Sequence, residues 1–288
     1  MRSPASTILL LHGFLGSSSD WAEFTRSAEA LNYCADDFVR VDLVRLASVM
    51  WQERREAPTL SRLADAAVRE AMARGSGVID VVGYSLGGRV AIEALECAAS
   101  DRVRRAVLVS AHPGIDDSTE RAARSQRDTR WAEELEAIGA TESQVDALSR
   151  ARSWLEAWYA QELFAPLRVS SAFPAALERR VEALASGEAA VWARIQRACS
   201  PGGVEPRWDA IERHHERVHL IVGARDRRYV EVFTRARALG LSTNTIPDAG
   251  HALPLEAPDA LAREVFEFLG CDGPMRTHSI AATVPTTE

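Results

Sequence analysis

Residues 78–91 read VIDVVGYSLGGRVA, and this stretch decides the fold of the 288-residue chain. A short apolar run leads into Gly83-Tyr84-Ser85-Leu86-Gly87, and an amphipathic helical pattern follows. Glycines two residues on either side of Ser85 allow a very sharp turn, because a Cβ there would collide with neighbouring backbone. The pattern predicts a nucleophile elbow that exposes the Ser85 hydroxyl at the end of a strand. The alternative is a glycine-rich strand-to-helix turn in which the serine is incidental.

Apolar runs and helical patterns alternate on both sides of this elbow. Six runs are typical of buried strands: residues 7–11, 38–43, 78–82, 106–110, 218–222 and 243–246. Five segments have apolar residues at helical spacing: residues 17–31, 60–73, 87–99, 230–239 and 258–269. The alternation predicts an α/β fold with a mainly parallel sheet flanked by helices, whose sites lie beyond the carboxyl ends of the strands.

One interval breaks the alternation. Residues 112–206 contain helical stretches rich in Arg, Glu, Ala and Trp but no convincing strand. We therefore expect a single core domain, residues 1–111 and 207–270, with a helical cap inserted at residues 112–206. The aromatic residues of this cap either form its own core or line a substrate site: Trp131, Trp154, Trp158, Tyr159, Phe164, Phe173 and Trp192. Residues 271–288 lack periodicity and are expected to form a mobile tail.

A second glycine-rich segment, residues 12–16, follows the first predicted strand and reads HGFLG. In a fold with a nucleophile elbow, the loop after this strand supplies one oxyanion donor and the residue after the nucleophile supplies the other. We therefore expect the backbone N–H groups of Phe14 and Leu86 to form an oxyanion hole. His12 is expected to hold this loop rather than to act as an acid or base.

A serine nucleophile needs a histidine base, and the histidine needs a carboxylate that fixes its tautomer. Asp226 follows the strand pattern at residues 218–222, and His251 follows the pattern at residues 243–246. Both therefore lie at the strand ends where Ser85 is expected, and they follow it in the chain order Ser, Asp, His. The sequence predicts the catalytic residues Ser85, Asp226 and His251. Asp248 is a competing carboxylate, but it lies in the same loop as His251 and is expected to shape that turn.

Composition narrows the function classes further. Hydrophobic residues make up 47% of the chain and charged residues 26%, as in ordinary globular proteins. The net charge of −7 disfavours a nucleic-acid partner. The four cysteines are widely spaced, no apolar run approaches a membrane span, and no pattern implies a metal, nucleotide or flavin. We expect a cytoplasmic enzyme without a cofactor that acts on a small molecule; the sequence does not determine its oligomeric state.

Several motifs together resemble one known family, the 2-succinyl-6-hydroxy-2,4-cyclohexadiene-1-carboxylate synthases of menaquinone biosynthesis. They are HGFLG at residues 12–16, GYSLGGRVA at 83–91, SAHPG at 110–114 and AGH at 249–251, together with the arginine-rich segment at 121–131. The resemblance covers most of residues 6–270. It implies an α/β-hydrolase fold and a lyase that eliminates pyruvate from an enolpyruvyl cyclohexene carboxylate, with Ser85 as general base.

The resemblance also implies residues that bind the carboxylates of such a substrate. Arg89 lies one helical turn beyond Ser85, and a guanidinium group matches a carboxylate bidentately. Arg124 matches a carboxylate-binding arginine of the family, while Tyr84 and Trp158 match pocket residues. The alternative for Arg124 is a solvated helix face. Where the family has a further cap arginine, this chain has Ala185, with Arg179 and Arg180 earlier on the helix, so one anion contact is expected to be missing or displaced.

Two other functions remain open at this point. A serine hydrolase of an ester, thioester or carbon–carbon bond would use every one of these catalytic residues. It would have no need for Arg89 and Arg124 to face the pocket if its substrate were neutral. A binding protein without catalytic activity is the second possibility, and the complete set of Ser, Asp and His argues against it.

Overall fold

The computed structural model describes residues 6–75, 77–141 and 143–270. Its centre is a six-stranded sheet in the order β2-β1-β3-β4-β5-β6, and every neighbouring pair is parallel. The strands are β1 (Thr7–Leu11), β2 (Phe38–Val41), β3 (Ile79–Tyr84), β4 (Val103–Val109), β5 (Val218–Gly223) and β6 (Ser242–Ile246). The parallel sheet predicted from the alternation is confirmed, and the carboxyl ends of all six strands meet at one edge.

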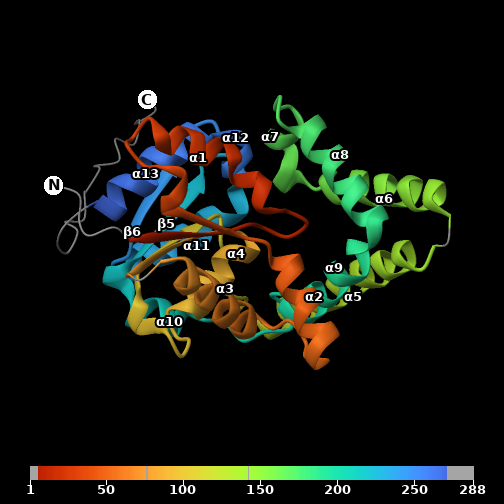
Figure 1. Ribbon diagram of the computed structural model, residues 1–288, viewed down its shortest axis with the longest axis horizontal. Helices are drawn as coiled ribbons and strands as arrows, with labels where there is room; N and C mark the ends of the chain where they lie inside the picture. Colours follow the sequence, from red (N-terminus) through yellow and green to blue (C-terminus); the bar gives the residue numbers. More distant parts are fainter. Residues whose placement is uncertain (1–5, 76, 142, 271–288) are drawn as a thin grey trace, which may run out of the picture.

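Helices cover both faces of the sheet. Figure 1 shows α1 (Ala22–Glu29) and α13 (Pro258–Gly270), which pack together, on one side, and α3 (Leu60–Arg74) and α4 (Leu86–Ala94) on the other. The other core helices are α2 (Leu43–Arg54), α10 (Trp208–Arg213), α11 (Arg227–Ala238) and α12 (Leu253–Glu256), with 3₁₀ turns at Ser18–Trp21, Ala35–Asp37, Ser100–Arg102 and His215–Arg217. Strands buried on both faces need near-continuous apolar runs, and Ile8, Leu9, Leu10 and Leu11 of β1 are all fully buried.

Several predicted boundaries are wrong, and two of them conceal a helix or a turn that the patterns missed. The strand predicted at residues 38–43 ends at Val41, and Asp42 begins α2, which the sequence patterns missed. The Asp42 carboxylate accepts a hydrogen bond from the Arg45 N–H at 3.0 Å, so Asp42 is an ordinary N-cap. The helix predicted at residues 87–99 ends at Ala94 and is followed by a turn.

Five further helices lie between β4 and β5, within residues 112–206. They are α5 (Ser118–Gly139), α6 (Gln144–Tyr159), α7 (Ala165–Arg168), α8 (Phe173–Ala183) and α9 (Ala189–Cys199), with a 3₁₀ turn at Glu162–Phe164 and a π-helical turn at Leu184–Glu188. α5 packs along α9, and this group projects from the carboxyl edge of the sheet (Figure 1). The predicted tail, residues 271–288, lies outside the described residues.

The chain enters and leaves this helical insertion at neighbouring points. The Arg207 N–H donates to the Pro113 carbonyl at 3.0 Å, and a Cβ on Gly114 would lie 2.5 Å from Cα of Pro206. The Arg207 guanidinium also forms an ion pair with Glu93, near the end of α4, at 3.1 Å. The two connections are therefore held together and fixed to the helix that begins at Ser85.

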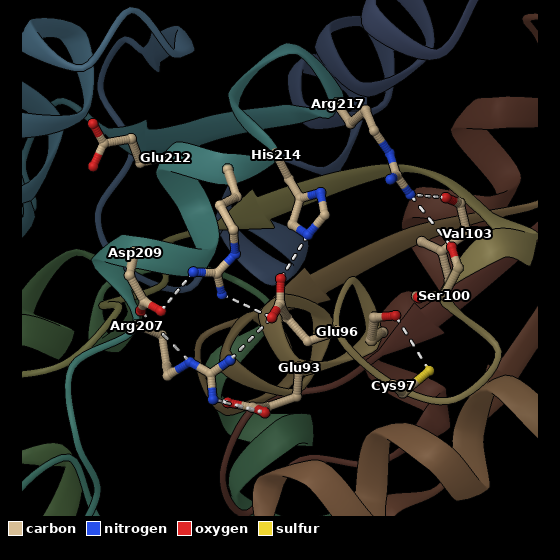
Figure 2. Close-up of polar contacts among 12 residues, drawn as sticks. Glu93, Glu96, Cys97, Ser100, Val103, Arg207, Asp209, Glu212, His214 and Arg217 are labelled. Carbon is tan, nitrogen blue, oxygen red and sulfur yellow. Dashed lines mark hydrogen bonds and ion pairs between the residues drawn. The ribbon is translucent and has the colours of Figure 1, made fainter.

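Further charged groups surround this junction. Figure 2 shows Arg207 and His214 converging on Glu96. The Arg213 guanidinium lies 2.8 Å from the Glu96 carboxylate, and His214 Nε2 lies 2.6 Å from it. Several charges that share one carboxylate stabilise more than isolated surface pairs do, so this cluster strengthens the base of the insertion. None of the helices within the described residues is long and apolar enough to cross a membrane.

A histidine buried beneath α13 makes stability depend on pH. His219 Nδ1 contacts the Ser242 hydroxyl at 2.8 Å, its ring stacks on Phe268, and burial lowers the pKa of His219 to about 4. The folded state therefore favours neutral His219. The contribution of this group to the free energy of unfolding is fully present above about pH 6.5 and is lost as the pH falls towards 4. We expect it to amount to roughly 3 kcal/mol over that window.

The measurement is urea unfolding of wild type and His219→Phe between about pH 7 and about pH 4.5. Wild type should lose more unfolding free energy on acidification than the variant does. An identical loss in both proteins would contradict this role for His219.

Candidate active site

The turn at Ser85 has the geometry of a nucleophile elbow. Ser85 joins β3 to α4 with φ 52° and ψ −107°, outside the regions that serine ordinarily occupies. A Cβ on Gly83 would lie 2.2 Å from the Gly87 carbonyl oxygen, and one on Gly87 would lie 2.1 Å from that of Leu11. Only glycine fits at either position, which is why the GxSxG spacing encodes this turn. The Ser85 side chain consequently stands above the carboxyl ends of the strands.

Three side chains from three strand ends form one hydrogen-bonded series. His251 Nε2 lies 3.2 Å from Ser85 Oγ, and His251 Nδ1 lies 2.7 Å from Asp226 Oδ2. His251 and Asp226 are each 2% exposed. With Nδ1–H donating to the carboxylate, Nε2 is free to accept the serine proton. The structure thus brings together the three residues predicted as catalytic, in an order that can activate the hydroxyl.

The predicted oxyanion residues border the same space. Phe14, in the loop after β1, and Leu86, the first residue of α4, both line the cavity above Ser85. The first N–H groups of a helix have no partner within the helix, so the Leu86 N–H is available to a ligand. The placement of both residues is compatible with the predicted oxyanion hole.

His12 lies behind this loop. Its Nδ1 contacts the Gly13 carbonyl at 2.9 Å, and its Nε2 accepts from the Leu43 N–H at 3.0 Å. One nitrogen donates and the other accepts, so the ring is neutral, and burial lowers the pKa of His12. These contacts fit the loop-holding role expected from the sequence.

Asp248 is separate from the series. It is exposed, has φ 59° and pairs with Arg225 at 2.8 Å. It therefore shapes its loop and does not contact His251.

Four arginines line the cavity that contains Ser85 and His251: Arg89, Arg124, Arg180 and Arg228. The Arg89 guanidinium donates to the Cys199 carbonyl at the end of α9, and burial lowers the pKa of Arg89 from its very high ordinary value. Arg124 Nε donates to Asp128 at 2.7 Å, and Arg180 donates to Asp20 at 2.7 Å. Each of these three guanidinium groups is held by the protein in a fixed position, which suits recognition of carboxylates.

The remaining wall is aromatic. Tyr84, Trp158, Tyr159, Phe164 and Tyr229 line the cavity, and the Tyr229 ring centre lies 4.8 Å from that of His251. Burial raises the pKa of Tyr84 well above its ordinary value, so its hydroxyl stays neutral. Trp158 also packs on Phe14, with ring centres 5.2 Å apart. The cavity therefore combines an apolar wall with several cationic groups.

With this geometry in place, the chain can be compared with known proteins. The Alpha/beta hydrolase family matches residues 8–264. The chain belongs to the alpha/beta hydrolase family. Its six-stranded parallel sheet flanked by helices agrees with this assignment, and the chain is therefore an enzyme of the alpha/beta hydrolase superfamily.

This alpha/beta hydrolase is similar in sequence to proteins of Arabidopsis thaliana and Klebsiella pneumoniae. It is 27% identical over 284 residues to Protein PHYLLO, chloroplastic, of Arabidopsis thaliana, an alignment that covers 93% of this chain and 16% of that protein. It is 29% identical over 182 residues to the 2-succinyl-6-hydroxy-2,4-cyclohexadiene-1-carboxylate synthase of Klebsiella pneumoniae (strain 342), covering 63% of this chain and 64% of the synthase. The chain thus spans less than two thirds of the length of either relative.

One solved structure shares the fold over almost the whole chain. MenH from S. aureus superposes with a TM-score of 0.76 at 19% identity, and the alignment covers 93% of this chain and 94% of that one. The resemblance to the synthase family that the sequence motifs indicate is confirmed by these comparisons.

In this alpha/beta hydrolase, Arg124 lines the cavity, whereas Arg127 and Arg130 on the same helix are exposed. The helix face is therefore divided, with Arg124 turned inward. Tyr84 and Trp158 also border the cavity. The aromatic residues divide as well: Trp158, Tyr159 and Phe164 are cavity-lining, while Trp131 packs on Trp154 within the helical insertion.

The sequence patterns did not assign five polar residues of the cavity wall to the site: His112, Gln161, Arg180, Gln196 and Arg228. Arg180 lies near the end of α8, five residues before Ala185, where it lines the cavity and pairs with Asp20. The anion contact expected to be missing or displaced at Ala185 therefore has a cationic neighbour in Arg180. Two of these residues lie beside motifs that the sequence analysis singled out, since His112 lies in SAHPG and Arg228 follows Asp226 closely. Only the packing of the insertion, however, shows which side chains face the cavity.

His112 adds a neutral donor to this wall. Its Nδ1 accepts from the Gly114 N–H at 3.0 Å, which leaves the proton on Nε2. Burial lowers the pKa of His112 to about 4, and the guanidinium groups of Arg228, Arg89 and Arg124 contribute in the same direction. Within the described residues, no group of three or more His, Cys, Asp and Glu side chains could hold a metal ion.

Proposed function

We propose that the chain is a carbon–oxygen lyase that eliminates pyruvate from an enolpyruvyl succinyl cyclohexene carboxylate to give 2-succinyl-6-hydroxy-2,4-cyclohexadiene-1-carboxylate. One observation carries the proposal: four guanidinium groups line the cavity that contains Ser85 and His251. A substrate with several carboxylates matches such a wall, because bidentate guanidinium–carboxylate contacts are strong and directional. The names of the synthase relatives point to the same reaction.

In this proposal Ser85 acts as the general base. His251 Nε2 receives the Ser85 proton while Ser85 Oγ removes a ring proton next to the succinyl ketone. The C–H electron pair moves through the ring double bond and breaks the carbon–oxygen bond to the enolpyruvyl group. His251 then protonates the departing enolpyruvate, which becomes pyruvate, and the Ser85 proton is restored from the ring proton it removed. Atoms balance without added water.

The surrounding groups stabilise the charges that develop. The ketone oxygen becomes negative as the proton leaves, and the N–H groups of Phe14 and Leu86 supply hydrogen bonds for it. Asp226 stabilises the imidazolium form of His251, which exists only while the proton is in transfer. Arg89, Arg124, Arg180 and Arg228 bind the carboxylates and fix the ring above Ser85, which keeps the reacting atoms aligned.

A serine hydrolase is the alternative, because the same hydrogen-bonded series can activate Ser85 as a nucleophile. The test is turnover of the enolpyruvyl substrate. We expect one pyruvate for each conjugated cyclohexadiene formed and no effect of a metal chelator. Deuterium at the abstracted ring position should slow the reaction where proton transfer limits the rate. Pyruvate release no faster than the uncatalysed background, together with rapid ester hydrolysis, would favour the hydrolase.

A further inference from the structure

Gln196 presents an unsatisfied polar atom in the wall of the catalytic cavity. It lies on the last turn of α9, is 6% exposed, and lines the cavity together with Ser85 and Arg89. Its amide nitrogen Nε2 is buried and has no hydrogen-bond partner among the described residues. A buried donor without a partner costs free energy, and such groups are rare in folded proteins. Because Gln196 lines the cavity, an acceptor atom of a bound ligand can be the partner of this donor.

The neighbouring polar groups of the same turn are engaged. The Cys199 carbonyl accepts from Arg89, and the Cys199 thiol donates to the Pro58 carbonyl at 3.0 Å. The Ser200 hydroxyl donates to Asp128 at 2.7 Å, and the same carboxylate oxygen accepts from Arg124. This turn therefore holds two cavity arginines in place, while the Gln196 amide nitrogen has no partner among the described residues.

A second glutamine in the cavity shows the contrast. Gln161 also lines it, but its Nε2 donates to the Trp158 carbonyl at 2.9 Å. The donor of Gln161 is thus satisfied within the protein, whereas that of Gln196 is not.

The Gln196 amide is a neutral donor, and this decides which ligand atom it binds best. Carboxylates are better matched by the charged arginines, whereas a neutral N–H donor suits a neutral oxygen. In the proposed reaction the ketone oxygen is held by Phe14 and Leu86, and the ether oxygen departs with the enolpyruvyl group, so the hydroxyl is the neutral oxygen that stays on the ring. The product name places this hydroxyl on carbon 6, next to the carboxylate on carbon 1. We propose that Gln196 is a specificity-determining residue that donates to the hydroxyl beside the ring carboxylate bound by Arg89 and Arg124. The choice of this hydroxyl rests on the proposed lyase function.

The test compares two simple acids that differ by this hydroxyl, trans-2-hydroxycyclohexane-1-carboxylate and cyclohexane-1-carboxylate. Their dissociation constants are measured by ligand-observed NMR with the full chain. Wild type should bind the hydroxy acid about fivefold more tightly, as expected for one neutral hydrogen bond. Gln196→Met keeps the length of the side chain but removes the donor, so the ratio should fall to about one, while the affinity for the unsubstituted acid stays the same.

Gln161→Met is the matched control, because it makes the same change in the same cavity at an amide that is already engaged; its ratio should stay at about five. Thermal unfolding checks that each variant is folded. Equal binding of the two acids by wild type, or an unchanged preference in Gln196→Met, would overturn the assignment. The measurement needs no turnover, so it can fail while pyruvate release succeeds, and the reverse also holds.

Discussion

Alanine at Ser85 or at His251 should reduce the turnover of the enolpyruvyl substrate by roughly three to six orders of magnitude, as for other triads of this kind. In the proposed reaction Ser85 Oγ takes the ring proton, and without His251 the serine's own proton has no acceptor. Because the two residues act as one unit, the double variant should be scarcely slower than either single variant. Asp226→Asn should lose about four orders of magnitude, since an amide favours the wrong His251 tautomer.

The measurement is steady-state pyruvate release by each variant, with thermal unfolding as the control for folding. Ser85→Ala keeps the Cβ, so the variant retains the steric demands of the elbow and should unfold near the wild-type temperature. Activity of Ser85→Ala within about tenfold of wild type would reject the elbow assignment, because the residual rate of such variants comes from binding and the oxyanion hole alone.

The second large effect concerns the arginine wall. Arg89→Ala and Arg124→Ala should each lower kcat/KM for the acidic substrate by roughly one to two decades, which is the effect of losing one charge-assisted contact. Hydrolysis of a small neutral ester such as an aryl acetate should barely change, because that substrate carries no carboxylate. Each variant also removes a structural contact, since Arg89 supports the end of α9 and Arg124 pairs with the buried Asp128.

Helix α5 offers the control for this experiment. Arg130 lies on the same helix as Arg124 but is exposed, so Arg130→Ala should affect neither substrate. Equal losses on the acidic and the neutral substrate in Arg124→Ala would show that this arginine supports the fold of the cavity and does not recognise carboxylates.

The elements that the sequence predicts well are those with a local physical cause. The strand, the sharp turn and the helix around Ser85 follow from apolar alternation and from two glycines that no other residue can replace. Asp226 and His251 can be predicted as partners of Ser85 because the carboxyl ends of parallel strands converge. Residues directly after two strand patterns therefore lie near the elbow. The missed helix α2 had a local signal too, in the Asp42 N-cap, but its weak apolar pattern concealed it.

The polar wall of the cavity could not be predicted in the same way. Arg180, Gln196 and Arg124 lie on three different helices of the insertion, and the direction of each depends on how those helices pack. Sequence spacing placed Arg124 on an arginine-rich helix without showing which face turns inward. Contacts over long sequence separations, such as Arg180 with Asp20, decide this and leave no local pattern.

The most direct test of the proposed lyase mechanism is the intact mass of the enzyme, measured by quenched mixing during the first turnovers of the enolpyruvyl substrate. If Ser85 is a general base, the enzyme keeps its unmodified mass while pyruvate accumulates, since no bond forms between Ser85 and the substrate. A mass increase that maps to Ser85 and precedes product release would instead reveal an acyl-enzyme, and would contradict the elimination mechanism.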